Sequence, residues 1–422
     1  MESAKKISIR LVLLAVIFLL ANFIYKKTFW QKDLEASNGE ILTDLLHAQD
    51  SADVIYMGES SNFTTDKNDT CKKSISDLTA DYFPSLVFKS VNKGAVHAGT
   101  YLALLKQMKN NCRTKTLIVT LNLRSFDADW INSKLETSLL RTNILFQKYP
   151  PLVNRFLLSL NAYNKKTEKQ RQEDLLAQLK TDPLNFPYDF KYKTAHQWDA
   201  AMANGGYLND DGSWNMPKIE LACHYIKTYG FQINTQTNPR IKDFDEIVKI
   251  CKRKNMNLVF NLLAENIQYA DSLVGKDLVY LMKQNRDLLV KRYHKDGVLV
   301  TDNLERVCGK DYIDKDWTTE HYTLNGRLSI ANNLANSLKK NYPKEFKDIK
   351  INIKPCFSNS PALTDTTLIS KALNDIEKRI RLTPEWMQQI KTKATERKIT
   401  IDEMIKLDAK YIYDTEVKSK TQ

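Results

Sequence analysis

The chain has 422 residues, of which 42% are hydrophobic and 27% are charged, so it belongs with globular proteins and not with disordered ones. Its formal net charge is +13, which suits an anionic partner such as a nucleic acid, a membrane or a cell wall. The six cysteines are widely spaced and form no Cys-x-x-Cys or Cys/His cluster, so we expect no metal site and no cofactor. Cys71 and Cys112 are candidates for a disulfide if the chain is exported, and separate buried thiols are the alternative.

An uncharged apolar segment lies close to the N-terminus. Leu11–Tyr25 contains no charged residue, and basic residues flank it on both sides. Ile7 and Ile9 lengthen this segment, and the flanking basic side chains can reach the bilayer surface, so the segment approaches the roughly 20 residues of a membrane-spanning helix. We therefore predict a single-pass membrane anchor over residues 1–27, with the main domain outside the cytoplasm. A cleaved signal peptide and a buried core helix are the alternatives, although no clear small-x-small cleavage site is present.

Strands and helices alternate after a juxtamembrane linker over 28–52. This alternation predicts a parallel sheet with right-handed crossovers, in a flavodoxin-like three-layer α/β sandwich over residues 53–345. The first crossover helix should begin at Asp69 or Thr70, which are good N-cap residues. The predicted strands are 53–57, 86–91, 116–121, 257–263 and 297–301, and the predicted helices are 71–82, 100–110, 241–253, 276–293 and 324–339.

Two segments depart from this alternation. Residues 126–240 contain no strong strand pattern and begin with a capping box at 133–136, so we expect a mostly helical insertion over the strand ends. That insertion would form either a substrate groove or a structural cover for the sheet. Residues 346–422 predict a helical C-terminal tail, with helix starts at Pro384 and at the capping box Thr400-Ile401-Asp402-Glu403.

Polar residues follow the predicted strands at the points where those strands end. Since the carboxyl ends of parallel strands meet at one edge of a sheet, these residues should lie close together. Ser60 is the candidate nucleophile, with Ser61 as the alternative if the turn shifts by one residue, and His321 is the candidate base. Backbone N–H groups near Gly94 and the amide of Asn122 are candidates for stabilising an oxyanion. This combination suits acyl transfer.

Three polar side chains at the same edge are candidates for substrate binding. The guanidinium of Arg124 suits a substrate carboxylate or phosphate, and a salt bridge with Asp127 or Asp129 is the alternative. The candidates are Ser61, Asn62 and Arg124.

These residues resemble the signature of the SGNH (GDSL-like) hydrolase superfamily, which names Ser, Gly, Asn and His in that chain order. The resemblance covers about 53–125 and 255–340, and it implies a fold of SGNH type and a serine esterase or acyltransferase activity. The matching blocks are Gly58-Glu59-Ser60, Asn92-Lys93-Gly94, Asn122, and His321 followed by Thr323-Leu324-Asn325-Gly326.

The acid that orients the histidine departs from the family pattern. In the family it lies three residues before the histidine, and Thr318 occupies that position here. Asp316 and Glu320 are the nearby substitutes. Glu59 also replaces the usual Asp of the first block.

The anchored layout is similar to the SGNH-like partners of bacterial membrane-bound O-acyltransferases. That resemblance implies action on acyl esters of a cell-envelope polysaccharide, with a membrane-bound O-acyltransferase as a partner. A catalytically inactive accessory protein, binding glycan or the acyltransferase, is the alternative. Export makes a nucleic-acid partner unexpected despite the positive charge.

Overall fold

The computed structural model describes residues 2–163, 166–314, 317–347, 377, 380–381, 383–397 and 399–412. The chain forms two compact units, Met1–Ile353 and Lys354–Gln422, which are described separately. The first unit contains the sheet and every candidate site residue except Asp316, which lies outside the described residues.

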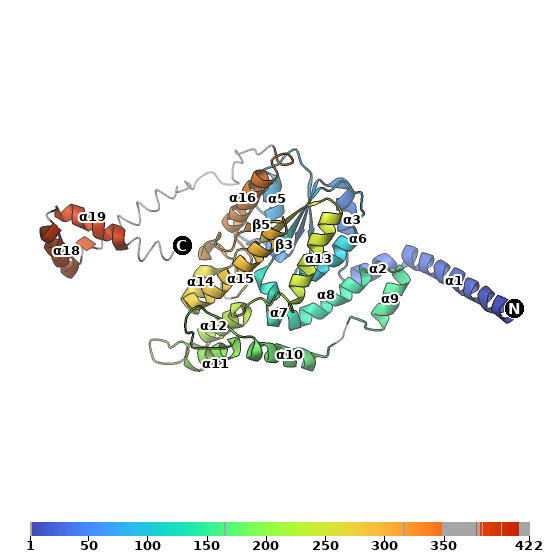
Figure 1. Ribbon diagram of the computed structural model, residues 1–422, viewed down its shortest axis with the longest axis horizontal. Coiled ribbons are helices and arrows are strands. Elements are labelled where there is room, and N and C mark those ends of the chain that lie inside the picture. Colours follow the sequence, from blue (N-terminus) through green and yellow to red (C-terminus); the bar gives the residue numbers. More distant parts are fainter. Residues whose placement is uncertain are drawn as a thin grey trace. The chain divides into compact units, whose positions relative to one another are not determined.

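A five-stranded sheet forms the centre of the first unit (Figure 1). All its strand pairs are parallel and the strand order is β2-β1-β3-β4-β5, the flavodoxin-like arrangement that the alternating pattern predicted. The predicted third strand is confirmed residue for residue, and the boundaries of the other strands differ by at most two residues. The strands are β1 (Val54–Gly58), β2 (Phe88–Asn92), β3 (Thr116–Leu121), β4 (Asn257–Leu262) and β5 (Leu299–Asp302).

Helices cover both faces of the sheet, as the alternation of buried side chains along the strands requires. Ile55 and Val119 belong to a core cluster with residues of α3, α6, α13 and α15, whereas Tyr56 and Ile118 pack with residues of α16. The three-layer architecture is therefore confirmed. The helices on the first face are α3 (Ile41–Ser51), α6 (Ala98–Gln107), α13 (Pro239–Arg253) and α15 (Lys276–Lys295), and those on the second are α5 (Ile75–Ala80) and α16 (Leu324–Asn341).

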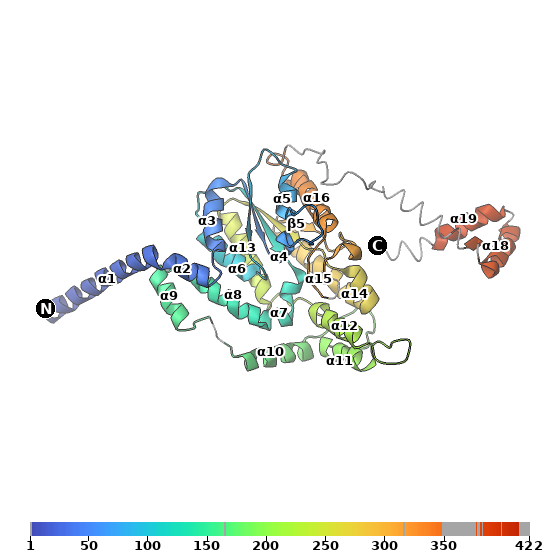
Figure 2. The same ribbon diagram turned by 180° about the vertical axis from the view of Figure 1, so that it is seen from behind.

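The segment between β3 and α13 is helical, as predicted. In both views its helices α10 to α12 lie beyond one end of the sheet, the end at which β3 leads into α7 (Figures 1 and 2). This part of the insertion therefore lies over the carboxyl ends of the strands, whereas α8 packs on α6 and α9 packs on α1. Its elements are η1 (Leu123–Phe126), α7 (Ala128–Asn132), α8 (Lys134–Leu145), α9 (Pro151–Ser159), α10 (Glu168–Thr181), α11 (Ala195–Gly205) and α12 (Met216–Tyr229).

The start of α5 differs from the sequence prediction. The helix begins after Ser74, which forms a capping box with Asp77, and neither Asp69 nor Thr70 caps it. Asp69 instead accepts hydrogen bonds from the backbone N–H of Leu324 and from Arg327. The prediction was wrong because several residues between 69 and 74 have side chains suited to capping a helix. Asp69 contacts α16, which is distant in sequence, and Ser74 caps α5.

The N-terminal apolar segment forms one helix, α1 (Glu2–Thr28), of which Ser3–Thr28 is long and apolar enough to cross a membrane. Two shorter helices, α2 (Trp30–Ala36) and α3, connect it to β1. The apolar stretch of α1 is exposed to its surroundings, not buried in the domain core. This exposure is inconsistent with the alternative of a buried core helix.

The five cysteines among the described residues are free thiols, including Cys71 and Cys112, so the alternative of separate thiols holds for them. In the second unit, α18 (Pro384–Arg397) and α19 (Ile401–Ile412) pack through a small apolar cluster. The predicted capping box is present, because Thr400 and Glu403 exchange backbone and side-chain hydrogen bonds.

Candidate active site

The glycine that ends β1 allows three segments to approach one another closely. An added Cβ at Gly58 would lie 2.3 Å from Asn92 Oδ1 and 2.9 Å from Asn62 Cβ. Asn62 belongs to the short helix α4 (Ser60–Phe63), and its amide donates to Asn92 Oδ1 and to Ser76 Oγ. Asn62 is fully buried by these contacts. Asn62, a candidate for substrate binding, is therefore a buried structural residue in this structure.

The two candidate nucleophiles occupy the first turn of α4. Ser60 begins the helix directly after Glu59 and is half-buried, whereas Ser61 is buried. A nucleophile must be reachable by its substrate, so the exposure favours Ser60. The turn of Asn92-Lys93-Gly94 lies beside this site, because the backbone N–H of Lys93 donates to the carbonyl of Gly58.

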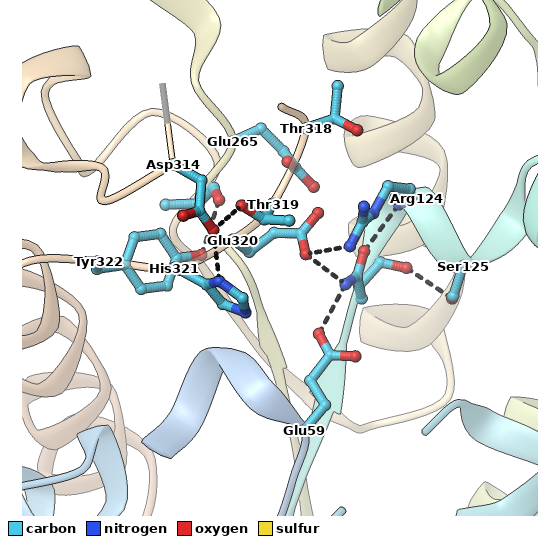
Figure 3. Close-up of polar contacts among 12 residues, drawn as sticks. Glu59, Arg124, Ser125, Glu265, Asp314, Thr318, Thr319, Glu320, His321 and Tyr322 are labelled. Carbon is cyan, nitrogen blue, oxygen red and sulfur yellow. Dashed lines mark hydrogen bonds and ion pairs between the residues drawn. The ribbon is translucent and has the colours of Figure 1, made fainter. Parts of the chain in front are cut away.

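His321 is paired with a carboxylate that the sequence reasoning missed. Its Nδ1 lies 2.7 Å from Asp314 Oδ2, and Thr319 Oγ1 donates to the same oxygen at 2.6 Å (Figure 3). An isolated antiparallel bridge between Tyr312 and Tyr322 brings the two sides of this loop together. Although burial opposes it, hydrogen bonding from Thr319 and His321 lowers the pKa of Asp314, so this carboxylate is ionised at neutral pH.

Of the two acids suggested by sequence proximity, only Glu320 lies among the described residues, and it does not pair with the ring. Asp316 lies outside the described residues. Glu320 turns away from His321 and accepts hydrogen bonds from Asn122 and Arg124. Adjacent residues in an extended segment point to opposite sides, which explains why Glu320 cannot serve the histidine next to it. The sequence feature that bears on Asp314 is the pair Tyr312 and Tyr322, which flank its loop and form a bridge that brings the two ends of the loop together.

The amide of Asn122 joins two buried carboxylates at the centre of the sheet edge. Its Nδ2 donates to Glu59 Oε1 at 2.6 Å and to Glu320 Oε2 at 3.1 Å, while its Oδ1 accepts from the backbone N–H of Arg124 (Figure 3). This network places Glu59 and Glu320 one amide apart. Ser60 and His321 directly follow these two acids in the chain, so they lie at the same edge.

Arg124 is also part of this network. Its Nη2 lies 3.0 Å from Glu320 Oε2, and its guanidinium stacks over the ring of Trp130 at 4.8 Å. The alternative expected for Arg124 was a salt bridge with Asp127 or Asp129. The structure contains a salt bridge of Arg124, but its partner is Glu320. The carboxylate partner raises the pKa of Arg124 even though burial opposes this.

Among the described residues at this sheet edge, more carboxyl groups than cations are buried. Glu265, which follows β4, accepts a hydrogen bond from Tyr229 at 2.6 Å. Burial, with the charge of Glu320 adding to it, raises the pKa of both Glu59 and Glu265. With Arg124 as the cation in this cluster, we conclude that part of the cluster is protonated at neutral pH. The described residues contain no group of three or more metal-ligating side chains suited to an ion.

The helical insertion contributes side chains to this edge. The ring of His224 on α12 stacks on Trp317 at 3.8 Å, and its Nε2 lies 2.7 Å from Thr318 Oγ1. Burial, and next the charge of Arg124, lowers the pKa of His224 to about 4. Thr318, which stands where the resembled family has its acid, therefore contacts the insertion instead. Sequence reasoning missed His224 because helical spacing gives no information on which loop a side chain meets.

Comparisons with known proteins add little beyond this geometry. No family model matches the chain, and no curated protein matches it. Among solved structures, an extracellular lipase from Streptomyces rimosus is similar over 67% of this chain and 99% of the lipase, with 13% sequence identity and a TM-score of 0.31. At that TM-score the similarity supports no statement about the site. The assignment of an α/β fold rests on the sheet and its helices, and the site rests on its own contacts.

Proposed function

We propose that the chain is a membrane-anchored serine esterase or O-acyltransferase, with its main domain outside the cytoplasm. The observation that carries the proposal is the His321–Asp314 pair, which lies at the same sheet edge as Ser60. An acid, a base and a reachable serine at strand ends are the parts that acyl transfer requires.

The contact between Nδ1 and Asp314 supports a separate role for each nitrogen of the imidazole. With Nδ1 donating to Asp314, the proton-free nitrogen is Nε2, which takes the proton of Ser60 as its Oγ attacks an ester carbonyl. The C–O bond to the leaving alcohol then breaks, and the same proton passes to that alcohol. Water, in an esterase, or an acceptor hydroxyl, in a transferase, then attacks the acyl-serine and gives its proton to Nε2. The bond between the acyl group and Ser60 Oγ breaks, and the proton passes from Nε2 to Oγ, which regenerates Ser60.

The N–H groups at the start of α4 and at Gly94 are the proposed oxyanion donors. Gly94 is exposed, and an added Cβ there would meet no atom within 4 Å. Asn122 is less suited than the sequence indicated, because its amide hydrogens are donated to Glu59 and Glu320. Asn122 would join the oxyanion site only after exchanging one of these carboxylates for substrate.

The proposed substrates are acyl esters of a cell-envelope polysaccharide. The support is the resemblance to membrane-anchored SGNH-like proteins, the candidate anchor α1 and the net charge of +13, which would favour an anionic glycan. A membrane-bound O-acyltransferase is the proposed partner on the same resemblance.

A non-enzymatic accessory role is the second candidate. It is favoured by the same engagement of Asn122 and by the burial of Ser61 and Asn62, because these side chains are then unavailable to a substrate. Such a protein would bind glycan or the acyltransferase through the same edge.

Turnover of a chromogenic acetyl ester by the full chain in detergent micelles tests the proposal. Ser60→Ala and His321→Ala should each abolish turnover, while Ser61→Ala should retain most of it. Retention of activity in both of the first two variants would exclude the assigned mechanism. Without turnover in the parent, binding of cell-wall polysaccharide that is lost on Arg124→Ala, but retained with an exposed control such as Arg141→Ala, would support the accessory role.

A further inference from the structure

The helix α9 presents an apolar stripe outward in addition to the apolar side that it buries through Leu158. Leu152, Phe156 and Leu160 recur every four residues along one side, and Phe156 and Leu160 are each 62% exposed. The polar side chain of Asn154 points inward instead, where it donates to the backbone carbonyls of Leu145 and Gln147.

The position of α9 beside α1 explains this outward apolar stripe. The two helices pack together, and α9 lies next to the α1–α2 junction in both views (Figures 1 and 2). Phe18, from the C-terminal half of α1, lines a shallow, mostly apolar groove whose α9 side is formed by Leu152, Val153, Arg155, Phe156 and Ser159. An outward stripe at that level of α1 faces the same surroundings as the apolar segment itself.

A polar residue inside the apolar segment fits the same arrangement. Asn22 Oδ1 accepts a hydrogen bond from the backbone N–H of Leu152, at the first turn of α9. An amide inside a membrane-spanning segment is costly unless it is paired, and the first N–H groups of a helix have no partner within it. The contact therefore satisfies one group on each helix and fixes α9 at the height of Asn22.

Charged and phenolic groups lock the two helices together one turn further along. Tyr25 donates from its hydroxyl to Asp33, and Arg155 Nε lies 3.2 Å from the same carboxylate. These contacts join α1, α2 and α9, so α9 is not free to turn its apolar stripe toward the domain.

We propose that α9 lies in the plane of the membrane interface and inserts Phe156 and Leu160 among the lipids, as a second membrane contact beside α1. The inference rests on the part of the proposed function in which α1 spans the bilayer, and it does not depend on the catalytic assignment. Amphipathic helices of this kind embed their apolar face at the boundary between headgroups and acyl chains. The lipid bilayer is the partner that fits, because the stripe is continuous with the apolar surface of α1.

Membrane contacts through both α1 and α9 would fix the orientation of the domain, which a contact through α1 alone would not. A single helix followed by a linker leaves a domain free to tilt, whereas a second element bound to the same interface fixes its orientation. The sheet edge that carries Ser60 and His321 would then be held at one height and one angle above the membrane.

Photo-cross-linking of the full chain in vesicles of phosphatidylethanolamine and phosphatidylglycerol tests this proposal. Benzoylphenylalanine replaces Phe156 or Leu160, and lipid adducts are counted by mass spectrometry. Phe23 of α1 is the positive control, and Leu176 of α10, a helical leucine with 46% exposure, is the matched negative control. Both test positions are exposed, so the substitution should not disturb folding.

We expect several-fold more lipid adduct at positions 156 and 160 than at 176, at a level close to that at 23. Adducts at 23 but not at 156 or 160 would overturn the proposal, as would cross-links from 156 to protein in place of lipid. An absence of lipid adducts at 23 would overturn it as well, since α1 would then not lie in the bilayer. Ester turnover is measured in the same preparations, so failure of the catalytic proposal is recognised independently.

Discussion

At the scale of single residues, the two acids near His321, Asp314 and Glu320, contact different partners. Asp314 holds the ring of His321, whereas Glu320 holds Asn122 and Arg124. Proximity along the chain suggested the wrong partner because side chains of an extended segment alternate in direction. The identity of Ser60 and His321 as candidates needed only motif and chain order, but the acid depended on how one loop folds back.

Replacing Asp314 with Asn should reduce kcat for ester turnover by about 10² to 10⁴-fold, because the ring would lose its negative partner and its fixed tautomer. The KM should change much less, since Asp314 is not proposed to touch the substrate. Steady-state kinetics of the full chain measure both values. Asp271→Asn, an exposed carboxylate on α14 (Ile267–Leu273), is the control and should behave like the parent. Equal kcat in both variants would remove Asp314 from the mechanism.

Gly58→Ala should destabilise the first unit by about 1 to 3 kcal/mol, because its new Cβ must displace Asn92 and Asn62 from their contact. Gly94→Ala is the matched control and should change stability by less than about 0.5 kcal/mol, since open space surrounds that position. Denaturant unfolding followed by tryptophan fluorescence gives the two values. The packing argument fails if both glycines tolerate alanine equally well.

At the scale of elements, hydrophobic periodicity predicted the strands and most helices well. The run at 116–121, whose sequence is TLIVTL, has the β-branched and apolar composition of a strand buried on both faces, and it forms β3, which is buried along its whole length. Helix starts were harder, as α5 shows, because several residues near 69–74 have suitable side chains. Long-range contacts decided among them, and these are absent from a local pattern.

Asp69 is therefore predicted to stabilise α16, in place of α5. It accepts from the first turn of α16 and pairs with Arg327, whose side chain is fully buried. Asp69→Ala should cost about 3 to 5 kcal/mol in unfolding free energy, because it leaves a buried guanidinium without its carboxylate. Asp81→Ala breaks an exposed pair with Lys73 and should cost at most about 1 kcal/mol. A small cost for Asp69→Ala would show that the backbone carbonyls around Arg327 suffice.

At the scale of the whole molecule, stability depends on pairs that connect distant segments. His97 caps α6 by accepting from Gly99 N–H at Nδ1, and its Nε2 lies 2.8 Å from Glu136 of the insertion. Glu136 also pairs with Arg240 of α13. The capping box expected from Glu136 is therefore incomplete: Ser133 caps α8, but the glutamate is held by these other partners.

Acidification should weaken the fold through His97. Burial, and next the charge of Arg240, lowers its pKa from 6.5 to about 4, although Glu136 opposes this. Because the unfolded chain binds a proton first as the pH falls from about 6.5 to 4, stability is lost over that window and levels off below it. We expect a loss of about 2 kcal/mol between pH 7 and pH 5.

A comparison of two histidine variants isolates the contribution of His97 to the pH dependence of stability. The pH dependence of the unfolding free energy should be smaller by about that amount in His97→Gln, whatever the stability of the variant at pH 7. His47→Gln, at an exposed position of α3, should keep the dependence of the parent. An unchanged pH dependence in His97→Gln would contradict the assignment.

The bridge between Tyr312 and Tyr322 has a consequence for how activity can be lost. It closes a short loop, so the entropy of bringing Asp314 to His321 is small and the pair can form without the rest of the sheet edge. Ser60 lies at the same sheet edge as His321 only when β1, β3 and α16 have assembled. We therefore expect that substitutions around β1 displace the proposed nucleophile and leave the His321–Asp314 pair intact. In the proposed mechanism, labelling of Ser60 by a fluorophosphonate probe reports the completed site, whereas a spectroscopic signal from the His321–Asp314 hydrogen bond reports only the loop.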